Sequence, residues 1–483
     1  MIACHKYCKP VLLFIPIFLL TNNFLFANIT LPSFFGDNMV LQQQTDAAIW
    51  GWANANSTVQ LTSSWNKKKY AVKAGADGKW KLKINTPTAG GPYEITISDG
   101  NAVTLKNVLI GEVWLCSGQS NMEMPMKGFR DQPIFNTNDA VFNSTNDQIR
   151  FYVVPRSVKV QTQDSSKNSN PIAIGWKAAD PETTNNFSAV AYFFGKILQK
   201  RLNVPIGLVN ISYGGSSAEA WMSTSALKNF PELAIPALAD SAKVNNRTPT
   251  TLYNGMLYPF IGYAIKGCIW YQGESNNGRP DQYEKLFPAM VAQWRNEFGQ
   301  GNFPFYYAQI APFKYSTQIT VEKNNSAYLR DAQRKSVAKI PESGMAVLMD
   351  IGDEYYIHPP DKETVSKRLA YMALAKTYSF KGFAHSSPSF DSLLIAGNTA
   401  TIKFKDVPNG LTSYGKTLAQ FEIAGANKVF YPATAVIRNG TIQLTSLSVA
   451  APVAVRYAFK DFIVGELFST EGFPVSSFRT DDW

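Results

Sequence analysis

The chain has 483 residues, of which 45% are hydrophobic and 17% are charged. This length predicts two or three domains, and the composition is that of a folded globular protein rather than a disordered one. The formal net charge of +10 comes from scattered basic residues, with no block of Lys and Arg longer than Lys67–Lys69. The charge therefore does not indicate a nucleic-acid-binding protein.

The N-terminal residues have the pattern of a secretory signal. Lys6 and Lys9 precede an apolar run from Val11 to Leu20, and cleavage is expected after Ala27. The apolar run is shorter than the roughly 20 residues that a membrane-spanning helix needs, and no later stretch reaches that length. We therefore predict that residues 1–27 are a signal peptide and that the protein is exported to the periplasm or the medium. No stable membrane insertion is expected after cleavage.

Cysteine and histidine usage points away from metal chemistry. Cys4 and Cys8 lie in the predicted signal peptide, which leaves Cys116 and Cys268. Both lie in apolar, strand-like segments, where they can form one disulfide or remain as buried thiols. The sequence contains no ligand spacing typical of a metal site, and no metal is expected.

The two ends of the remaining chain, residues 28–108 and 384–483, are predicted to be small β-domains. Apolar and polar residues alternate there in short segments such as Lys79–Ile84 and Thr399–Phe404. Turn signals such as Ala76–Gly78 separate these segments. The N-terminal β-domain is expected to be sandwich-like.

Residues 109–383 have a different pattern, typical of a parallel sheet covered by helices. Continuous apolar runs suit strands that are buried on both faces. Such runs occur at Val108–Leu115, Ile206–Ile211, Gly267–Tyr271, Phe305–Ile310 and Met345–Met349. Between them, apolar residues recur at helical spacing near residues 190–198, 283–294 and 365–372. This alternation predicts a doubly wound α/β domain flanked by the two β-domains.

The residues that directly follow the apolar runs are the candidates for catalysis, because ligands bind at the carboxyl ends of the strands in an open α/β sheet. Ser120 follows the first run in a glycine-containing turn and is a candidate nucleophile. Gly214 and Gly215 follow the second run, where backbone N–H groups can bind an oxyanion. The side-chain amides of Gln272 and Asn276 follow the third run and are further candidate oxyanion donors.

Counting histidines selects His358 as the candidate general base. Of the three histidines, His5 lies in the predicted signal peptide, and His385 begins the C-terminal β-domain away from other candidates. His358 follows the fifth apolar run, after Asp350 and Asp353, and an imidazole can take a proton from serine near neutral pH. A hydroxyl, a base and oxyanion donors at one edge of a sheet predict acyl transfer. The sequence contains no phosphate-binding loop and no dinucleotide fingerprint.

Three sequence blocks around these candidates also carry a family resemblance. They are Gly111–Glu123, Trp270–Asn276 and Ile357–Pro359, joined by similar pieces at Met39–Gln42, Trp50–Trp52, Tyr213–Gly215 with Trp221, Leu252–Met256 and Gly472–Thr480. Together they resemble the sialate O-acetylesterase family of the SGNH hydrolase superfamily over nearly the whole chain after residue 27. The resemblance implies an SGNH-type fold and a cofactor-free esterase. Such an enzyme releases acetate from O-acetylated sialic acid or from related acetylated plant glycans.

By position, the resemblance also implies roles for individual residues. Ser120 corresponds to the nucleophile, with its backbone N–H as one oxyanion donor, and His358 corresponds to the base. One of Gly214 and Gly215 corresponds to the oxyanion glycine. Gln272 stands where the superfamily usually has an Asn, which favours it over the nearby Asn276.

One position departs from the superfamily pattern. Many members carry an Asp three residues before the catalytic His, where it orients the imidazole, and here that position is Tyr355. We therefore expect a Ser–His dyad whose imidazole is oriented by a backbone carbonyl, with Asp353 as the next candidate.

The sequence leaves several functional alternatives open. The same fold can act on acetyl xylan or another plant glycan, or transfer the acyl group to a sugar instead of water. A catalytically inactive carbohydrate-binding protein is the alternative from another class. In each case the expected ligand is an acetylated sugar or glycan. The oligomeric state is not predicted.

Overall fold

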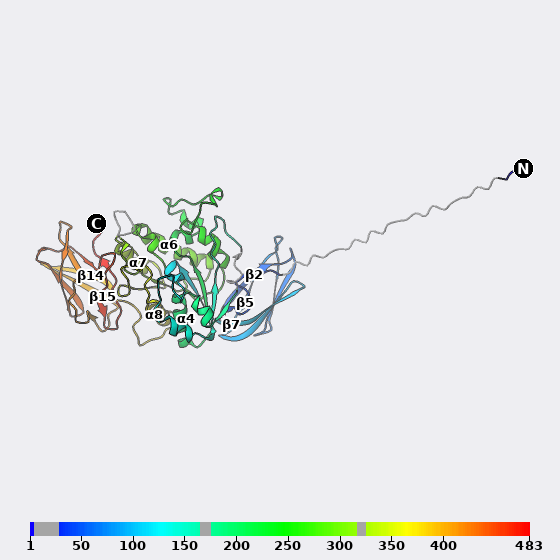
Figure 1. Cartoon of the computed structure of the whole chain (residues 1–483), viewed down its shortest axis with the longest axis horizontal. Helices are drawn as coiled ribbons and strands as arrows, with labels where there is room; N and C mark the ends of the chain where they lie inside the picture. Colours follow the sequence, from blue (N-terminus) through cyan, green and yellow to red (C-terminus); the bar gives the residue numbers. More distant parts are fainter. Residues whose placement is uncertain (4–28, 165–174, 316–324) are drawn as a thin grey trace.

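The computed structural model describes residues 1–3, 29–164, 175–315 and 325–483 of the chain (Figure 1). The predicted signal peptide, apart from its first three residues, lies outside the described residues. Within those ranges, no helix is both long and apolar enough to cross a membrane. A β-rich N-terminal region and a β-rich C-terminal region lie at opposite ends of a mixed α/β region (Figure 1).

A mostly parallel sheet forms the middle of the molecule. Its strands lie in the order β13-β12-β11-β7-β10-β8-β9, and all neighbours run parallel except β8 and β9. The chain places β8 and β10 on one side of β7 and β11 to β13 on the other, so the predicted doubly wound sheet is confirmed. The strands are β7 (Ala102–Gly118), β8 (Asn146–Val153), β9 (Lys177–Ala179), β10 (Ile206–Ser212), β11 (Gly267–Tyr271), β12 (Phe305–Ala308) and β13 (Ser343–Ala346).

Helices cover both faces of this sheet. One face carries α4 (Ala189–Leu202) and α8 (Lys362–Met372), and the other carries α6 (Pro280–Phe298) and α7 (Ala327–Lys339). The apolar spacing predicted α4, α6 and α8. Shorter helical segments are α1 (Ser120–Glu123), α2 (Thr137–Phe142), α3 (Pro181–Asn185), α5 (Thr224–Leu227), η2 (Ala218–Trp221), η3 (Leu238–Asp240), η4 (Tyr253–Leu257), η5 (Tyr258–Phe260), η6 (Glu274–Asn276) and η8 (Ala373–Thr377).

The N-terminal β-rich region is built onto the central sheet through one long strand. The first half of β7 pairs with β6, and its second half pairs with β10 and β11. The expected domain boundary at residues 108 and 109 therefore falls inside a continuous strand. The other strands of this region are β1 (Val40–Gln42), β2 (Asp46–Trp52), β3 (Thr58–Ser63), β4 (Lys69–Lys73), β5 (Lys79–Asn85) and β6 (Gly90–Ser98).

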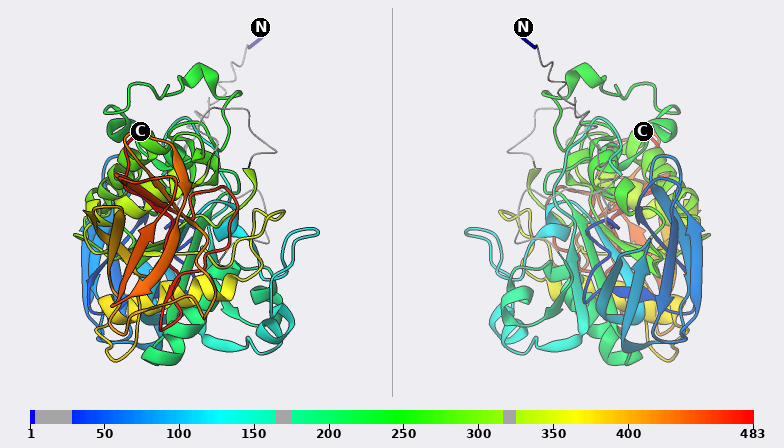
Figure 2. Two further views of the ribbon diagram at one scale, coloured as in Figure 1. Left: turned by 90° about the vertical axis from the view of Figure 1, so that its left-hand side faces the viewer. Right: turned by 90° about the vertical axis from the view of Figure 1, so that its right-hand side faces the viewer.

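The C-terminal β-rich region consists of antiparallel sheets around its own core. One sheet has the order β14-β15-β20-β19, a second has the order β18-β17-β21-β23, and β16 pairs with β22. Figure 2 shows these sheets from one end of the molecule and the N-terminal sheets from the other. The strands are β14 (Ser389–Ala396), β15 (Thr399–Lys405), β16 (Leu411–Thr412), β17 (Phe421–Ala424), β18 (Phe430–Pro432), β19 (Thr434–Arg438), β20 (Thr441–Thr445), β21 (Ala454–Tyr457), β22 (Phe468–Ser469) and β23 (Phe478–Arg479).

Two expected strands, β12 and β13, end earlier in the structure than their apolar runs, and β8 was not predicted. Residues 347–349 were expected to continue β13, but Val347 and Met349 instead pack into the core of the C-terminal region. Residues 309 and 310 likewise lie beyond β12. The first three residues of β8 are polar and exposed or half-buried, so its sequence lacks the continuous apolar run of the other central strands.

Cys116 and Cys268 are buried free thiols. They lie on the adjacent strands β7 and β11, but Cys268 pairs with Leu115 and Cys116 pairs with Ile269. Side chains of successive residues in a strand point to opposite faces, so the two sulfurs belong to cores on opposite sides of the sheet. Burial raises the pKa of both thiols. Of the two alternatives that the sequence left open for this pair, the structure shows buried thiols and not a disulfide.

Candidate active site

Ser120 lies where β7 turns sharply into α1. Gly118 ends the strand with a φ of +140°, and a Cβ at that position would lie 2.1 Å from the carbonyl oxygen of Tyr271 on β11. Only glycine fits such a close approach of two backbones. Ser120 is the first residue of α1 and is half-buried at the carboxyl edge of the sheet. The sheet itself therefore fixes the place of the candidate nucleophile.

His358 contacts Ser120 directly. Its Nε2 atom lies 2.7 Å from Oγ of Ser120. Its Nδ1 atom lies 2.5 Å from Oε1 of Gln132. Because an amide oxygen only accepts hydrogen bonds, Nδ1 carries the imidazole proton and Nε2 presents its lone pair to the serine hydroxyl. This arrangement suits abstraction of the serine proton.

A tight turn holds Gln132 against the imidazole. Phe129 and Gln132 exchange two backbone hydrogen bonds of 3.1 Å each. Gly128 precedes this turn with a φ of +78°, and a Cβ there would lie 2.3 Å from the carbonyl oxygen of Gln132. The ring of Phe129 packs edge-on against the imidazole of His358, with 5.2 Å between the ring centroids. The turn thus contacts the base through both an amide and an aromatic ring.

The group that orients the imidazole differs from the one expected. In the described structure Gln132, and neither a backbone carbonyl nor Asp353, contacts Nδ1 of His358. The Oδ1 atom of Asp353 instead accepts hydrogen bonds from the backbone N–H groups of Tyr355 and Tyr356, at 2.8 and 2.9 Å. Asp353 therefore shapes the turn before His358.

The other carboxylates near this loop are also engaged elsewhere. Asp350 forms an ion pair of 2.6 Å with Arg368 of α8. Glu354 forms an ion pair of 2.7 Å with Lys314. The imidazole therefore has a neutral amide at the place where a catalytic triad has a carboxylate.

The surroundings of His358 keep it unprotonated. Burial, and after it the nearby charge of Lys362, lower the pKa of His358 to about 4. A carboxylate at Nδ1 would oppose this shift by stabilising the imidazolium, but the amide of Gln132 carries no charge. The imidazole is therefore present as the free base throughout the neutral pH range.

The two candidate oxyanion glycines differ in their availability. Gly214 lies against the nucleophile, since a Cβ on it would be 3.4 Å from Cβ of Ser120. Its N–H donates to Oε2 of Glu123 at 2.7 Å and is engaged. Among the described residues, the N–H groups of Gly215 and Ser120 donate to no acceptor. These two backbone groups are the unengaged donors of the expected set.

The two candidate oxyanion amides, Gln272 and Asn276, are bonded to each other and to their surroundings. Nε2 of Gln272 donates to Oδ1 of Asn276 at 2.7 Å and to the carbonyl of Ser216 at 3.2 Å. Nδ2 of Asn276 donates to Oε2 of Glu219 at 2.8 Å. Both amide side chains are fully buried. Their contacts tie the loops after β10 and β11 together, and their role as oxyanion donors stays a prediction.

Four polar residues close to the dyad were missed by reasoning from sequence. Gln132 lies between α1 and α2, away from the carboxyl ends of the central strands. Asn121 and Glu274 lie just after the carboxyl ends of β7 and β11, and this position was the signal that could have found them. Lys362 begins α8 and reads as an ordinary surface residue, yet it is fully buried.

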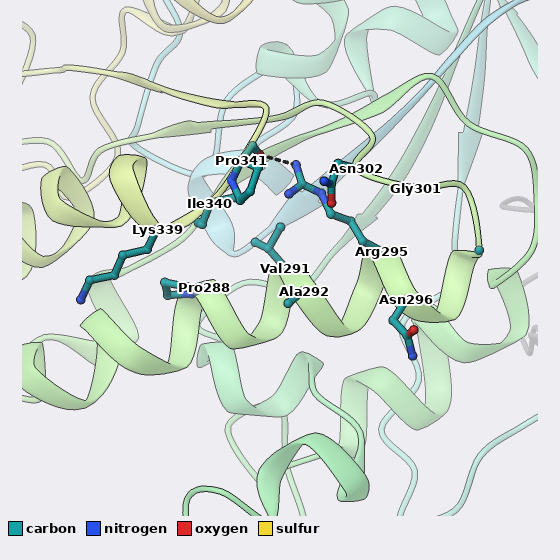
Figure 3. Close-up of a pocket in the computed structure, with 11 residues that line it drawn as sticks. Pro288, Val291, Ala292, Arg295, Asn296, Gly301, Asn302, Lys339, Ile340 and Pro341 are labelled. Carbon is teal, nitrogen blue, oxygen red and sulfur yellow. Dashed lines mark hydrogen bonds between the residues drawn. The ribbon is translucent and has the colours of Figure 1, made fainter.

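A cavity of about 600 Å³ lies elsewhere on the central domain, between α6 and the segment that follows α7 (Figure 3). Its lining includes Arg295, whose guanidinium donates to the carbonyl of Pro341 at 2.8 Å. None of the predicted site residues lines this cavity, and its lining contains neither serine nor histidine. The candidate active site is therefore the Ser120–His358 pair and not this cavity.

The chemistry available at the dyad is acyl transfer. A serine hydroxyl in contact with an unprotonated imidazole, next to unengaged backbone N–H groups, suits attack on an ester carbonyl. In the described ranges, no group of three or more His, Cys, Asp or Glu side chains could hold a metal ion. Fold and site together define the class of carboxylic-ester hydrolases.

Comparison with known proteins narrows this class. Residues 110–374 match the family described as carbohydrate esterase, sialic acid-specific acetylesterase. Human sialate O-acetylesterase is 30% identical over 392 residues, which cover 74% of this chain and 72% of that protein. The rat sialate O-acetylesterase is 30% identical over 415 residues, covering 74% and 75%. The chain belongs to this sialic acid-specific acetylesterase family.

A solved structure agrees over nearly the full length. A carbohydrate acetylesterase from Xanthomonas citri is 37% identical and superposes with a TM-score of 0.84. The match covers 94% of this chain and 100% of that one. The flanking β-rich regions are therefore part of the shared architecture.

Proposed function

We propose that the protein is an exported serine esterase that hydrolyses O-acetyl esters of sialic acid. The observation that carries the proposal is the 2.7 Å contact between Nε2 of His358 and Oγ of Ser120. The names of the human and rat relatives support sialate as the sugar. The name of the Xanthomonas citri protein refers to carbohydrates more broadly, which favours acetylated plant glycans as the second substrate class to test.

In the first half of the reaction, Ser120 becomes acetylated. Oγ attacks the acetyl carbonyl carbon while its proton passes to Nε2 of His358. The N–H groups of Ser120 and Gly215 stabilise the negative charge on the former carbonyl oxygen. The C–O bond to the sugar then breaks, and the leaving sugar oxygen takes the proton from Nε2. During this step Gln132 keeps the Nδ1 proton in place.

In the second half, water removes the acetyl group. His358 takes a proton from water, whose oxygen attacks the acetyl carbon of acetyl-Ser120. When the tetrahedral intermediate collapses, the bond to Oγ breaks and the serine recovers its proton from the imidazole. The immediate products are acetic acid and free enzyme, and the acid ionises in water to acetate and a proton. Atoms and charges therefore balance without any cofactor.

Aromatic side chains next to the base support a sugar substrate. Tyr355 and Tyr356 precede His358 by three and two residues, and their side chains are 76% and 43% exposed. A chain of three residues spans at most about 11 Å, so the Cα atom of Tyr355 lies within that distance of the Cα atom of His358. Exposed aromatic rings with a polar hydroxyl can stack on the apolar face of a sugar and donate a hydrogen bond to it.

A third aromatic ring lies next to Ser120 in the loop after β10. Tyr213 directly precedes Gly214, which lies against Ser120. The guanidinium of Arg156 lies over the Tyr213 ring at 4.8 Å and pairs with Glu123. Glu123 neutralises the charge of this half-exposed guanidinium, but arginine has five N–H donors. The N–H groups that Glu123 does not use suit a hydrogen bond to the carboxylate of a sugar such as sialic acid.

The proposal is tested by measuring acetate release by the full chain from O-acetylated sialic acid and from acetylated xylan. Ser120→Ala removes the proposed nucleophile, and Ser448→Ala, at an exposed serine of the C-terminal region, serves as the matched control. We expect release from acetylated sialic acid that is abolished only by Ser120→Ala. Release from xylan alone would change the substrate class. Sugar binding without release from either substrate would support a carbohydrate-binding protein instead.

Export is tested separately by sequencing the N-terminus of the protein recovered from the periplasm or the medium. The predicted cleavage gives a mature chain that begins at Asn28. An intact Met1 on protein recovered from the cytoplasm would contradict this part of the proposal and leave the esterase activity untouched.

A further inference from the structure

The residue next to the nucleophile contacts the residue next to the base. Asn121 follows Ser120, and its side chain is only 1% exposed. Its Nδ2 atom donates to the carbonyl of Ile357 at 3.1 Å. Ile357 in turn directly precedes His358. One buried amide therefore links the two chain segments that carry the dyad.

All hydrogen-bonding atoms of this amide are engaged. Besides the bond to Ile357, Nδ2 donates to Oε1 of Glu274 at 2.5 Å. Oδ1 accepts from Nζ of Lys362. Lys362 is placed by the start of α8, where Oδ1 of Asp361 accepts the backbone N–H of Thr364 at 2.9 Å. We call Asn121, Glu274 and Lys362, with the Ile357 carbonyl, the Asn121 clamp.

Burial makes the two charged members of the clamp depend on each other. Lys362 is fully buried and Glu274 is 8% exposed. Burial raises the pKa of Glu274 and lowers the pKa of Lys362 to about 7, and each shift is opposed by the charge of the other residue. A buried charge that loses its partner is strongly destabilising. The side-chain amide of Asn121 is therefore held by Glu274 at Nδ2 and by Lys362 at Oδ1.

We infer that Asn121 is a positioning residue that fixes His358 within hydrogen-bond reach of Ser120, and that Glu274 and Lys362 hold it in place. The inference rests on the proposed serine mechanism. His358 lies on an irregular segment between β13 and α8, so no backbone ladder sets its distance from Ser120. Displacement of a reacting group by about 1 Å can cost on the order of 100-fold in rate.

The experiment compares Asn121→Ala with wild type and Ser120→Ala in one assay of ester hydrolysis. We expect kcat to fall about 10- to 100-fold with KM changed less than about threefold, because the clamp contacts neither substrate nor reacting atoms. The rate at which a phosphonate ester labels Ser120 should fall in parallel. The acid limb of the pH profile should keep its position, because positioning changes the rate and not the pKa of the base.

Asn325→Ala is the matched control. Nδ2 of Asn325 also donates to a backbone carbonyl, that of Phe459, at 2.8 Å. Its Oδ1 accepts the backbone N–H of Ala327 at the start of α7, and Asn325 is not part of the dyad or the clamp. We expect a lowered Tm in both variants and a lowered kcat in Asn121→Ala alone. An Asn121→Ala protein with the kcat of the control would overturn the inference. An inactive wild type would instead refute the proposed function.

The charged members give a second test that does not depend on the folding of Asn121→Ala. Lys362→Met removes the donor to Oδ1 with little change in side-chain length, and we expect kcat to fall while KM is kept. Glu274→Gln keeps an acceptor for Nδ2 and should lose less kcat than Glu274→Ala. Equal losses for the Gln and Ala variants, or an unchanged kcat in Lys362→Met, would contradict the clamp.

Discussion

Ser120 and His358 meet at one point, but different parts of the structure hold them there. Ser120 follows a strand whose register with β10 and β11 continues to Gly118, so the backbone of the sheet places it. His358 lies on the irregular segment after β13, and side chains hold it: Gln132 at Nδ1 and Asn121 at the preceding carbonyl. The backbone hydrogen bonds of a sheet fix a residue at a strand end, whereas a residue on a loop is fixed by side-chain contacts.

The largest expected effect is on kcat, and it tests whether Ser120 and His358 act as one catalytic unit. Ser120→Ala and His358→Ala should each lower kcat by roughly 10⁴-fold or more, and the double variant should be no worse than the single ones. His385→Ala, at the other described histidine, is the control and should keep full activity. Acetate release at saturating substrate measures all four. Losses that multiply in the double variant would mean that the residues act independently.

The second effect is on folding of the nucleophile region. Gly118→Ala places a methyl group 2.1 Å from the carbonyl oxygen of Tyr271 at a φ of +140°. We expect a loss of about 3 kcal/mol or more in the free energy of unfolding, together with loss of activity. Gly278→Ala is the matched control, because Gly278 has a φ of +90° and no atom within 4 Å of the added methyl group.

Thermal unfolding of the two glycine variants separates backbone strain from the clash. The control should lose about 1 kcal/mol through the unfavourable φ alone. Equal shifts in Tm for both variants would show that the close approach of β7 and β11 does not determine the turn at Ser120.

The difference between regular strands and irregular segments also explains how much of the fold could be predicted. Central strands such as β10 and β11 are buried on both faces and appear in the sequence as unbroken apolar runs. The half-polar β8 gives no such signal. The boundary of the N-terminal region was also not predictable in detail, because β7 is one continuous strand that serves two sheets.

The site residues were likewise predictable at strand ends and not on irregular segments. Ser120 was predictable because residues at the carboxyl ends of parallel strands share one edge of the sheet. His358 was found by counting histidines and not by its place in the fold. Gln132 was not predictable, since its contact with Nδ1 depends on how the turn at residues 128–132 packs against a distant loop. Side-chain contacts between irregular segments leave no periodic pattern in a sequence.

The third effect concerns the orienting amide. Gln132→Ala removes the acceptor at Nδ1, so the imidazole can change tautomer and turn, and we expect kcat to fall about 10- to 100-fold. Gln132→Glu keeps an acceptor and adds a negative charge that stabilises the imidazolium. It should therefore move the acid limb of kcat/KM upward by about 1 to 3 pH units. Gln148→Glu, at an exposed glutamine on β8, is the control for added charge. An unmoved acid limb in Gln132→Glu would mean that Gln132 does not face the base.

The fourth effect is the pH dependence of the unmodified protein. The pKa of His358 is lowered to about 4, so the base stays unprotonated as the pH falls well below the ordinary value for histidine. We expect kcat/KM to stay level down to about pH 5 and to fall as the pH passes through the pKa of the base. An acid limb near pH 6.5 would show that burial does not depress the pKa of this loop-borne base.

The smallest expected effect is on KM, and it tests whether the loop that carries His358 also binds the sugar. Tyr355→Ala removes a 76% exposed ring, three residues before His358, without touching the contacts of Ser120. We expect KM for an acetylated sugar to rise about 3- to 10-fold, as the loss of one stacking contact of about 1 kcal/mol implies, and KM for a small aryl acetate to rise less. Tyr414→Ala, at a 61% exposed tyrosine of the C-terminal region, is the control. If both substrates respond equally, Tyr355 shapes the loop that carries the base, and sugar recognition lies with the nucleophile side of the site.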